Sequence, residues 1–231
     1  GIRSSIYTAQ LNSDGSIQAW KTSSVELPQA MFGIQATVVN DDIYLFGGST
    51  SEQASGYSDK AYLLKVNALG VPTALTECTA MPQARCFHAV ASNGNNIFVT
   101  GGMNTNGDKQ NTVWHATVNN DGTLGAWQTM ASLPNVLAQH TATCTNDIIA
   151  LVGGIDNSGF ASNRTIYAYT DGTNLSWQES DEFLSNRTMD AAICYYKNFI
   201  LISGGVNMVG TTLANSVYMP ILTSSAQVRE A

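Results

Sequence analysis

Charged side chains are scarce in this sequence. They account for 12% of its 231 residues, about half of the roughly 25% that is usual for a soluble domain. Asn, Ser, Thr and Gly must therefore supply most of the polar surface, a composition that is typical of secreted or cell-surface β proteins. We accordingly expect the protein to be secreted or displayed at a cell surface.

Basic residues and long apolar runs are also few. Ten Lys and Arg stand against 17 Asp and Glu, for a formal net charge of −7, and no basic cluster occurs, which argues against a nucleic-acid partner. No apolar run approaches the roughly 18 residues of a membrane-spanning helix, so we expect no direct membrane insertion. The polar start, Gly1 to Ser5, does not have the pattern of a signal peptide. An export signal is expected to have been removed or to lie upstream.

The four cysteines do not have the spacing of a metal site. None belongs to a C-x-x-C pair, and no histidines are interleaved with them at zinc-finger spacing. No metal and no cofactor are therefore predicted. Cys78 and Cys86 are close enough in sequence for a disulfide, but the repeat described below places one on an outer strand and the other near an inner one. We expect unpaired thiols.

Candidate catalytic groups are equally few. The sequence has three histidines, His88, His115 and His140, and no G-x-S-x-G motif that would indicate a nucleophile elbow. No catalytic residue is predicted on this evidence. Paired carboxylates on separate repeats leave no linear motif, so glycoside cleavage stays open as an alternative.

What the sequence does contain is an internal repeat. A Gly-Gly pair ends a β-rich run four times, at steps of 54, 52 and 51 residues. A Pro or Ser precedes each pair by 19 residues, and a Trp or Leu follows a turn glycine by five. The pairs are Gly47-Gly48, Gly101-Gly102, Gly153-Gly154 and Gly204-Gly205, and the tryptophans are Trp20, Trp127 and Trp177.

Each repeat contains four short runs with alternating or β-branched character. In the best-preserved copy they are His88–Ala91, Ile97–Thr100, Thr112–Val118 and Leu124–Thr129. Asp-Gly pairs such as Asp121-Gly122 supply the positive φ that tight hairpin turns require. A four-stranded antiparallel unit repeated in tandem predicts an all-β fold, a β-propeller whose blades bury both faces against their neighbours.

These units resemble the kelch family of propellers, in which Gly-Gly closes the second strand, an aromatic pair marks the third and a Trp marks the fourth. Ile43 to Gly48 and Pro82 to His88 carry the resemblance, which covers residues 6 to 219. Leu75 in place of Trp and Ser185 in place of Pro depart from the pattern. Val118 to Trp127 is also similar to a bacterial variant of the repeat.

The resemblance implies one kelch-like domain or fragment over residues 1–231, with about 4 to 5 blades. We expect repeat units at 1–27, 28–80, 81–132, 133–183 and 184–222, the first and last of them partial, and a tail at 223–231. The first two strands, Ser5–Leu11 and Ile17–Thr22, read as the third and fourth of a blade. Kelch propellers commonly have six or seven blades, so we expect a larger ring completed by other chain segments. A small ring closed by the two termini is the alternative.

One face of the predicted propeller carries the long and variable loops. These loops follow the Gly-Gly pairs and share a face with the segments that enter the first strand of each blade; we call it the Gly-Gly face. Variable loops on a rigid scaffold are where binding function arises, so this face is the candidate binding surface. The loops are Ser49–Lys60, Met103–Asn111, Ile155–Arg164 and Val206–Asn215.

Two arginines and two histidines are candidate ligand contacts near this face. Arg85 and Arg187 carry the planar fork that binds carboxylates bidentately, and the alternative is that they tie adjacent blades together through carbonyl oxygens. His88 and His140 occupy the same repeat position. Their alternative is a hydrogen-bonded histidine at the start of an inner strand.

Asp156 and Asn157 are candidate ligand contacts in the third loop. They lack the alternation and the distal Glu of a dedicated calcium loop, so loop turns are the alternative. The Gly-Gly pairs are assigned to close backbone approach, and the three tryptophans to packing between blades.

The leading functional hypothesis is a non-enzymatic binding or assembly module that engages a protein or a glycan through the loops after the Gly-Gly pairs. The first alternative is a sugar-active enzyme similar to the kelch-type sialic acid mutarotases. The second is a purely structural subunit of a surface or extracellular assembly.

Overall fold

The strands of this protein form where the sequence alternates or carries a short apolar run. The computed structural model describes residues 2–145, 147–170, 174–197 and 199–207, together with the backbone of four short strands beyond residue 211. Runs such as Ile43–Phe46, Ile97–Thr100 and Ile148–Val152 form the second strands of their sheets and are almost entirely buried. A strand that is buried on both faces loses its polar side, which explains why these runs do not alternate.

Three complete four-stranded antiparallel sheets occupy the middle of the chain. The first has β3 (Gln35–Val39), β4 (Asp42–Phe46), β5 (Ala61–Val66) and β6 (Pro72–Glu77), with the 3-10 turn η1 (Ala54–Gly56) in its long loop. The second has β7 (Ala89–Asn93), β8 (Asn96–Thr100), β9 (Val113–Thr117) and β10 (Gln128–Thr129). The third has β11 (Thr141–Cys144), β12 (Ile148–Val152), β13 (Thr165–Thr170) and β14 (Leu175–Glu179).

Further sheets lie before and after these three. A hairpin of β1 (Arg3–Thr8) and β2 (Lys21–Met31) precedes them. The last sheet contains β15 (Ala192–Tyr196), β16 (Phe199–Ser203), β19 (Val217–Tyr218), β20 (Pro220–Leu222) and β21 (Val228–Glu230). A small pair, β17 (Val206–Asn207) and β18 (Thr212–Leu213), follows its Gly-Gly pair. The predicted turn at Asp171-Gly172 and most of the loop Val206–Asn215 lie outside the described residues.

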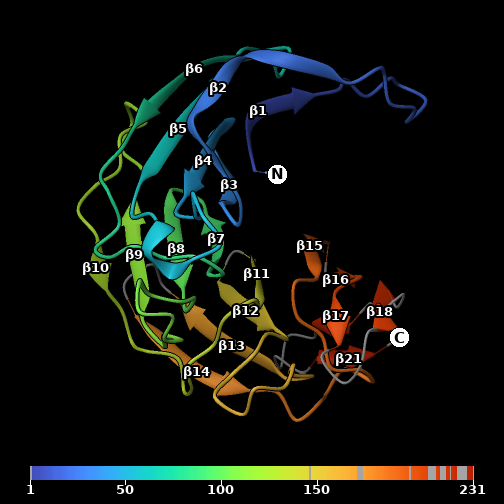
Figure 1. Cartoon of the computed structure of the whole chain (residues 1–231). Coiled ribbons are helices and arrows are strands. Elements are labelled where there is room, and N and C mark those ends of the chain that lie inside the picture. Colours follow the sequence, from blue (N-terminus) through green and yellow to red (C-terminus); the bar gives the residue numbers. More distant parts are fainter. Residues whose placement is uncertain are drawn as a thin grey trace.

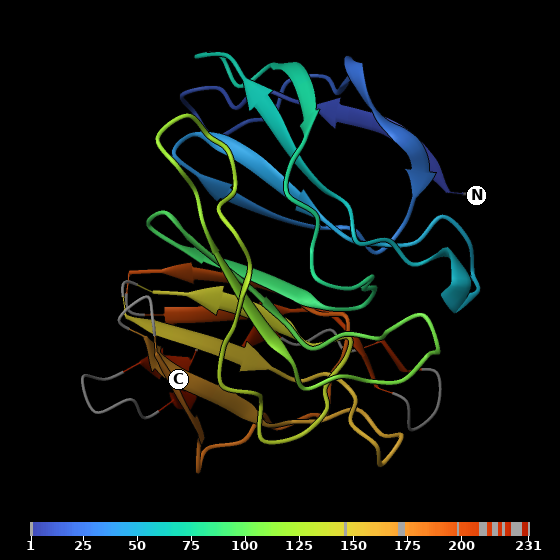
Figure 2. The ribbon, with the colours of Figure 1, turned by 90° about the vertical axis from the view of Figure 1, so that its left-hand side faces the viewer.

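The sheets fan around a common centre as the blades of a β-propeller (Figure 1). The first strands β3, β7, β11 and β15 lie side by side toward the centre, and β6, β10 and β14 lie at the periphery. The structure therefore confirms the predicted all-β propeller of four-stranded antiparallel blades. Turned by 90°, the blades are stacked, with η1 and the long green and yellow-orange loops at one end and the short hairpin turns at the other (Figure 2).

Each of the first three Gly-Gly pairs joins its blade to the segment that enters the next one. Gly47 and Gly48 have φ of +59° and +90°, and a Cβ on Gly47 would come within 2.5 Å of the Arg85 carbonyl oxygen. The second glycine of each pair donates its N–H to that segment: Gly48 to Arg85 at 2.9 Å, Gly102 to Leu137 at 2.8 Å and Gly154 to Thr188 at 2.9 Å. Only glycine satisfies both the positive φ and the close approach.

Tryptophans fill the spaces between blades. Trp127 meets Phe46 of the preceding blade edge-on at 5.8 Å, and its indole N–H donates to the Thr79 carbonyl at 3.1 Å. Trp177 repeats the arrangement one blade later and donates to the Ala131 carbonyl at 2.8 Å. Each indole thus packs its ring and satisfies its donor in the preceding blade.

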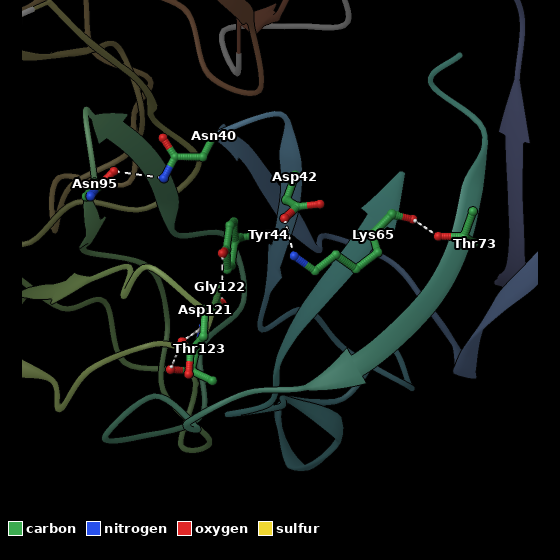
Figure 3. Close-up of polar contacts among 9 residues, drawn as sticks. All are labelled: Asn40, Asp42, Tyr44, Lys65, Thr73, Asn95, Asp121, Gly122 and Thr123. Carbon is green, nitrogen blue, oxygen red and sulfur yellow. Dashed lines mark hydrogen bonds and ion pairs between the residues drawn. The ribbon is translucent and has the colours of Figure 1, made fainter. Parts of the chain in front are cut away.

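The blades are also tied together at the opposite end, where the short turns lie (Figure 3). The Tyr44 hydroxyl donates to the Gly122 carbonyl at 2.8 Å, and Asn40 donates to Asn95 at 2.9 Å. The Asp121 carboxylate accepts from the backbone N–H of Thr123 at 2.9 Å and from its hydroxyl at 2.7 Å, which closes the turn. Among the described turns at this end, the one at Asp121 is thus closed by its own side chains.

The first hairpin departs from the sequence prediction. The second strand was expected at Ile17–Thr22, whereas β2 covers Lys21–Met31 and pairs with β1 as far as Arg3 and Met31, through two register shifts. Leu11 and Ile17 form only an isolated bridge. Trp20 was assigned to inter-blade packing, but it is 67% exposed. Trp127 and Trp177 are each covered by the blade that precedes their own. Among the described residues no such blade lies beside Trp20, so its side chain is exposed.

Candidate functional site

Arg85 lies inside the propeller and not on its surface. Its side chain has no exposed area, and one terminal nitrogen donates to Gln83 and Thr112, each at 3.1 Å. The guanidinium carbon lies 4.5 Å from the ring centroid of Trp114. Burial lowers the pKa of Arg85 to about 10, so it remains charged at neutral pH. The guanidinium group of Arg85 thus forms its hydrogen bonds with residues of its own blade.

His88 and His140 are also buried, at 1% and 6% exposure. Burial lowers the pKa of each to about 3, and for His88 the charges of His140 and Arg85 add to the effect. His140 Nε2 lies 2.8 Å from the Thr100 hydroxyl, whereas neither ring nitrogen of His88 has a hydrogen-bond partner. Both rings are neutral at physiological pH. A general base must come within hydrogen-bond reach of its substrate, and these rings do not reach the surface.

The third histidine belongs to the packing of its blade. His115 is stacked on Phe98 with a centroid distance of 5.1 Å, and its Nε2 lies 2.8 Å from the Asn96 side-chain oxygen. Across the residues that the structure describes, no group of three His, Cys, Asp or Glu side chains has the arrangement of a metal site. The four cysteines are free, which agrees with the expectation of unpaired thiols.

A row of residues with left-handed backbone conformation precedes the first strands of the blades on the Gly-Gly face, and sequence reasoning missed it. Gly33, Phe87, Gln139 and Asp190 each stand two residues before the first strand of a blade, with φ of +65°, +59°, +55° and +54°; we call them the inner rim. The Gln139 N–H donates to the Phe87 carbonyl at 2.8 Å, and the Asp190 N–H to the Gln139 carbonyl at 2.9 Å. The signal was present in the sequence, since one copy has glycine at this position and the spacing follows the repeat.

The inner rim carries side chains of different character. The Gln139 amide donates to the Asp190 carboxylate at 2.7 Å, and partial desolvation raises the pKa of Asp190. The Phe87 ring lies 6.2 Å from Phe32 and 6.1 Å from Tyr57. Positive φ at a bulky non-glycine residue is a strained conformation, and here the backbone bonds between neighbouring blades hold it in place.

Arg187 and Asp156 come together in a pocket on the Gly-Gly face. The pocket has a volume of about 480 Å³ and lies between the loop that follows β12 and the segment that leads into β15. Asn157 is exposed beside it. The residues that line the pocket include Asp156, Phe160, Asn163, Arg164, Phe183 and Arg187. Of the predicted contacts, the structure thus groups Arg187 with Asp156 and separates both from Arg85, His88 and His140.

The charged groups of this pocket are not equivalent. Arg164 forms an ion pair with Glu179 at 2.8 Å. Asp156 accepts from the Ser158 N–H at 2.7 Å. Hydrogen bonding by Ser158 and the positive charge of the nearby Arg164 lower the pKa of Asp156. Arg187 is exposed and donates one hydrogen bond, of 3.3 Å, to the Ala161 carbonyl. Phe160 and Phe183 are about half exposed.

Comparison with protein families gives one model that matches most of the chain. The model is described as the KLHDC2/KLHL20/DRC7 Kelch-repeats domain and matches residues 33–225. Among curated proteins, Kelch-like protein 36 of Rattus norvegicus is 30% identical over 168 residues, which are 72% of this chain and 26% of the rat protein. Beta-scruin of Limulus polyphemus is 28% identical over 147 residues, or 61% of this chain and 15% of that protein. The chain thus spans about a quarter or less of the curated relatives it matches.

A solved structure has the same fold over the whole chain. The structure of YjhT superposes with a TM-score of 0.75 at 16% identity, over 100% of this chain and 82% of that one. At this identity the likeness concerns the fold alone.

Proposed function

The chain belongs to the kelch-repeat family, and from this premise we propose that it is a non-enzymatic binding domain that engages a protein partner through the loops of the Gly-Gly face. Kelch-repeat propellers typically serve as protein-interaction modules. The proposal extends this general property to one face of this particular chain.

The observation that carries the proposal is the separation of buried from exposed polar groups. Arg85, His88 and His140 are the side chains best suited to acid–base or anion-binding chemistry, and all three are buried inside the blades. The loops that line the pocket around Arg187, by contrast, expose both charged and aromatic side chains, among them Arg187, Phe160 and Phe183. Long loops that differ in sequence, held by a repeated scaffold, suit recognition of one partner.

The opposite end of the blades supports the choice of face. Two of its described turns are closed by their own side chains. At one, Asp121 accepts from Thr123; at the other, the side chain of Asn67 accepts from the N–H groups of Leu69 and Val71 at 3.0 Å. Such turns satisfy their polar groups internally. They therefore offer fewer unpaired donors to a partner.

A sugar-active enzyme is the second reading, and the geometry favours it less. That chemistry would use Arg and His or acidic groups around the central mouth, and of these Arg85, His88 and His140 are buried and do not reach a substrate. The low content of charged residues supports the further proposal that the protein acts at a cell surface or after secretion. Surface labelling of intact source cells, with a cytosolic marker as control, tests that location.

Photo-crosslinking at two matched positions tests the proposed face. Benzoylphenylalanine replaces either Phe160, at 52% exposure on the Gly-Gly face, or Leu69, at 74% exposure in an opposite turn. The probes are peptides selected from a displayed random heptapeptide library on the immobilised protein. We expect crosslinks from position 160 and none from position 69. Crosslinks from position 69 alone would overturn the proposal.

A further inference from the structure

The pocket beside Arg187 contains one cation without an acidic partner. Arg164 is neutralised by Glu179, and Asp156 is tied to Ser158. Arg187, in contrast, has no ion pair within the described part of the chain and makes only one long hydrogen bond to a carbonyl. A guanidinium has five N–H donors in a fixed fork, so most of the donors of Arg187 are available to a ligand.

Aromatic surface lies beside this cation. Phe160 and Phe183, 52% and 49% exposed, line the same pocket. Neighbouring half-exposed rings around a pocket indicate a binding site, whereas single exposed apolar residues are common on any protein surface. A ligand that satisfies both features combines an anionic group with a neighbouring apolar group.

The charge of the pocket limits the kind of anion. Phosphate groups carry close to two negative charges and are generally bound by clusters of basic side chains. Here one arginine is free, the second is already paired, and the Asp156 carboxylate, held ionised by its lowered pKa, faces the same space. A single carboxylate fits this balance because it pairs bidentately with one guanidinium and is repelled less by Asp156 than a dianion.

We propose that this pocket binds an acidic peptide segment of the partner, with a carboxylate paired to Arg187 and an adjacent apolar side chain against Phe160 and Phe183. This inference rests on the proposed function and names the chemistry of its partner. The volume of about 480 Å³ lies within the usual range of small-ligand pockets, about 300–1,000 Å³, and accommodates one or two side chains. The net charge of the whole chain, −7, opposes indiscriminate binding of acidic proteins.

The experiment uses a random heptapeptide library displayed on phage and the full chain as bait. We expect the selected peptides to contain Asp or Glu next to Phe, Leu, Ile or Met. Arg187→Gln should weaken their binding by about tenfold, the loss of one charge-assisted bidentate contact. Replacing the peptide Glu by Gln should have the same effect, and the two changes together should cost little more than either alone.

Lys109→Gln is the matched control. Lys109 lies in the loop between β8 and β9 on the same face, so its substitution removes the same charge but leaves the pocket intact. Binding should be unchanged within about twofold. An equal loss in both variants would mean long-range electrostatics and would overturn the pocket assignment. Because Arg187 is exposed, Arg187→Gln should keep the melting temperature of the parent protein.

The remaining outcomes separate the two proposals. Selected peptides without an acidic residue, or peptides that bind Arg187→Gln normally while still crosslinking to position 160, would contradict the inference and leave the proposed function standing. Peptides that crosslink only to position 69 would contradict both. N-acetylneuraminic acid serves as a sugar carboxylate probe: Arg187-dependent binding of this sugar in the absence of any acidic-peptide binding would also contradict the inference.

Discussion

The guanidinium carbon of Arg85 lies 4.5 Å from the ring centroid of Trp114, and the arginine has no exposed surface. A fully buried arginine is costly unless its donors are satisfied. Here Gln83, Ala84 and Thr112 accept from its terminal nitrogens, while the Nε group has no partner. The pair therefore belongs to the framework that supports the Gly-Gly face and not to the ligand surface.

Arg85→Ala should destabilise the protein without a specific effect on ligand binding. It removes the contact with Trp114 and leaves a cavity, for an expected loss of about 3 kcal/mol. Urea unfolding monitored by tryptophan fluorescence measures the loss. Unchanged stability together with lost binding of a selected peptide would instead assign Arg85 to the ligand site.

Stability should fall as the pH is lowered below about 6.5, because His88 and His140 are buried in neutral form. Their folded-state pKa is about 3, well below the ordinary value of 6.5, so the unfolded chain takes up protons first. The loss approaches about 1.4 kcal/mol per pH unit for each histidine between these two values. Above pH 6.5 the contribution is constant.

Urea unfolding between pH 5 and pH 7.5 checks this dependence in a window above the titration of most carboxylates. His140→Gln should roughly halve the slope. His115, whose pKa is also lowered by burial, adds in the same direction. Stability that is flat over this window would show that the two histidines are accessible to protons in the folded state.

Gly47→Ala and Gly107→Ala separate two requirements for glycine. Both positions have positive φ, +59° and +83°. A Cβ at position 47 would meet the Arg85 carbonyl at 2.5 Å, whereas nothing lies within 4 Å at position 107. We expect a loss of about 1 kcal/mol at Gly107 from the backbone alone and at least about 3 kcal/mol at Gly47. Equal losses would refute the close approach between blades.

Trp127→Ala and Trp20→Ala form a second matched pair. Trp127 packs on Phe46 and donates to Thr79, so its removal should cost about 2–3 kcal/mol of stability in this half-buried position. Trp20 stands at the same repeat position but is exposed, and its removal should change stability by less than about 0.5 kcal/mol. Thermal unfolding of the 231-residue chain distinguishes these values. A comparable loss at Trp20 would mean that a contact covers it in solution.

The fold was predictable because its determinants are local and repeated. The Gly-Gly pairs and the apolar second strands recur four times and the Asp-Gly turns three times, and each has a direct structural consequence, as Gly48 and Asp121 show. The first hairpin was not predicted correctly, because a copy of the repeat pattern does not reveal whether a neighbouring blade is present. That neighbour decides the environment of Trp20.

The candidate site was predictable only in part. The sequence indicated the Gly-Gly face and named Arg187 and Asp156, which share a pocket. It also named Arg85, His88 and His140, whose burial depends on packing against Trp114, Gly47 and Gly101 from other parts of the chain. Phe160 and Phe183 belong to no motif, and within the inner rim only Gly33 and the repeat spacing gave a signal in the sequence.

Hydrogen–deuterium exchange of the chain with and without a selected acidic peptide tests the central claim most directly, namely that the Gly-Gly face is the binding surface and the pocket beside Arg187 its centre. The account predicts protection of residues 155–164 and 183–187, no change in the turn at 67–71, and loss of the protection in Arg187→Gln. Protection confined to 67–71 and the other hairpin turns would contradict it.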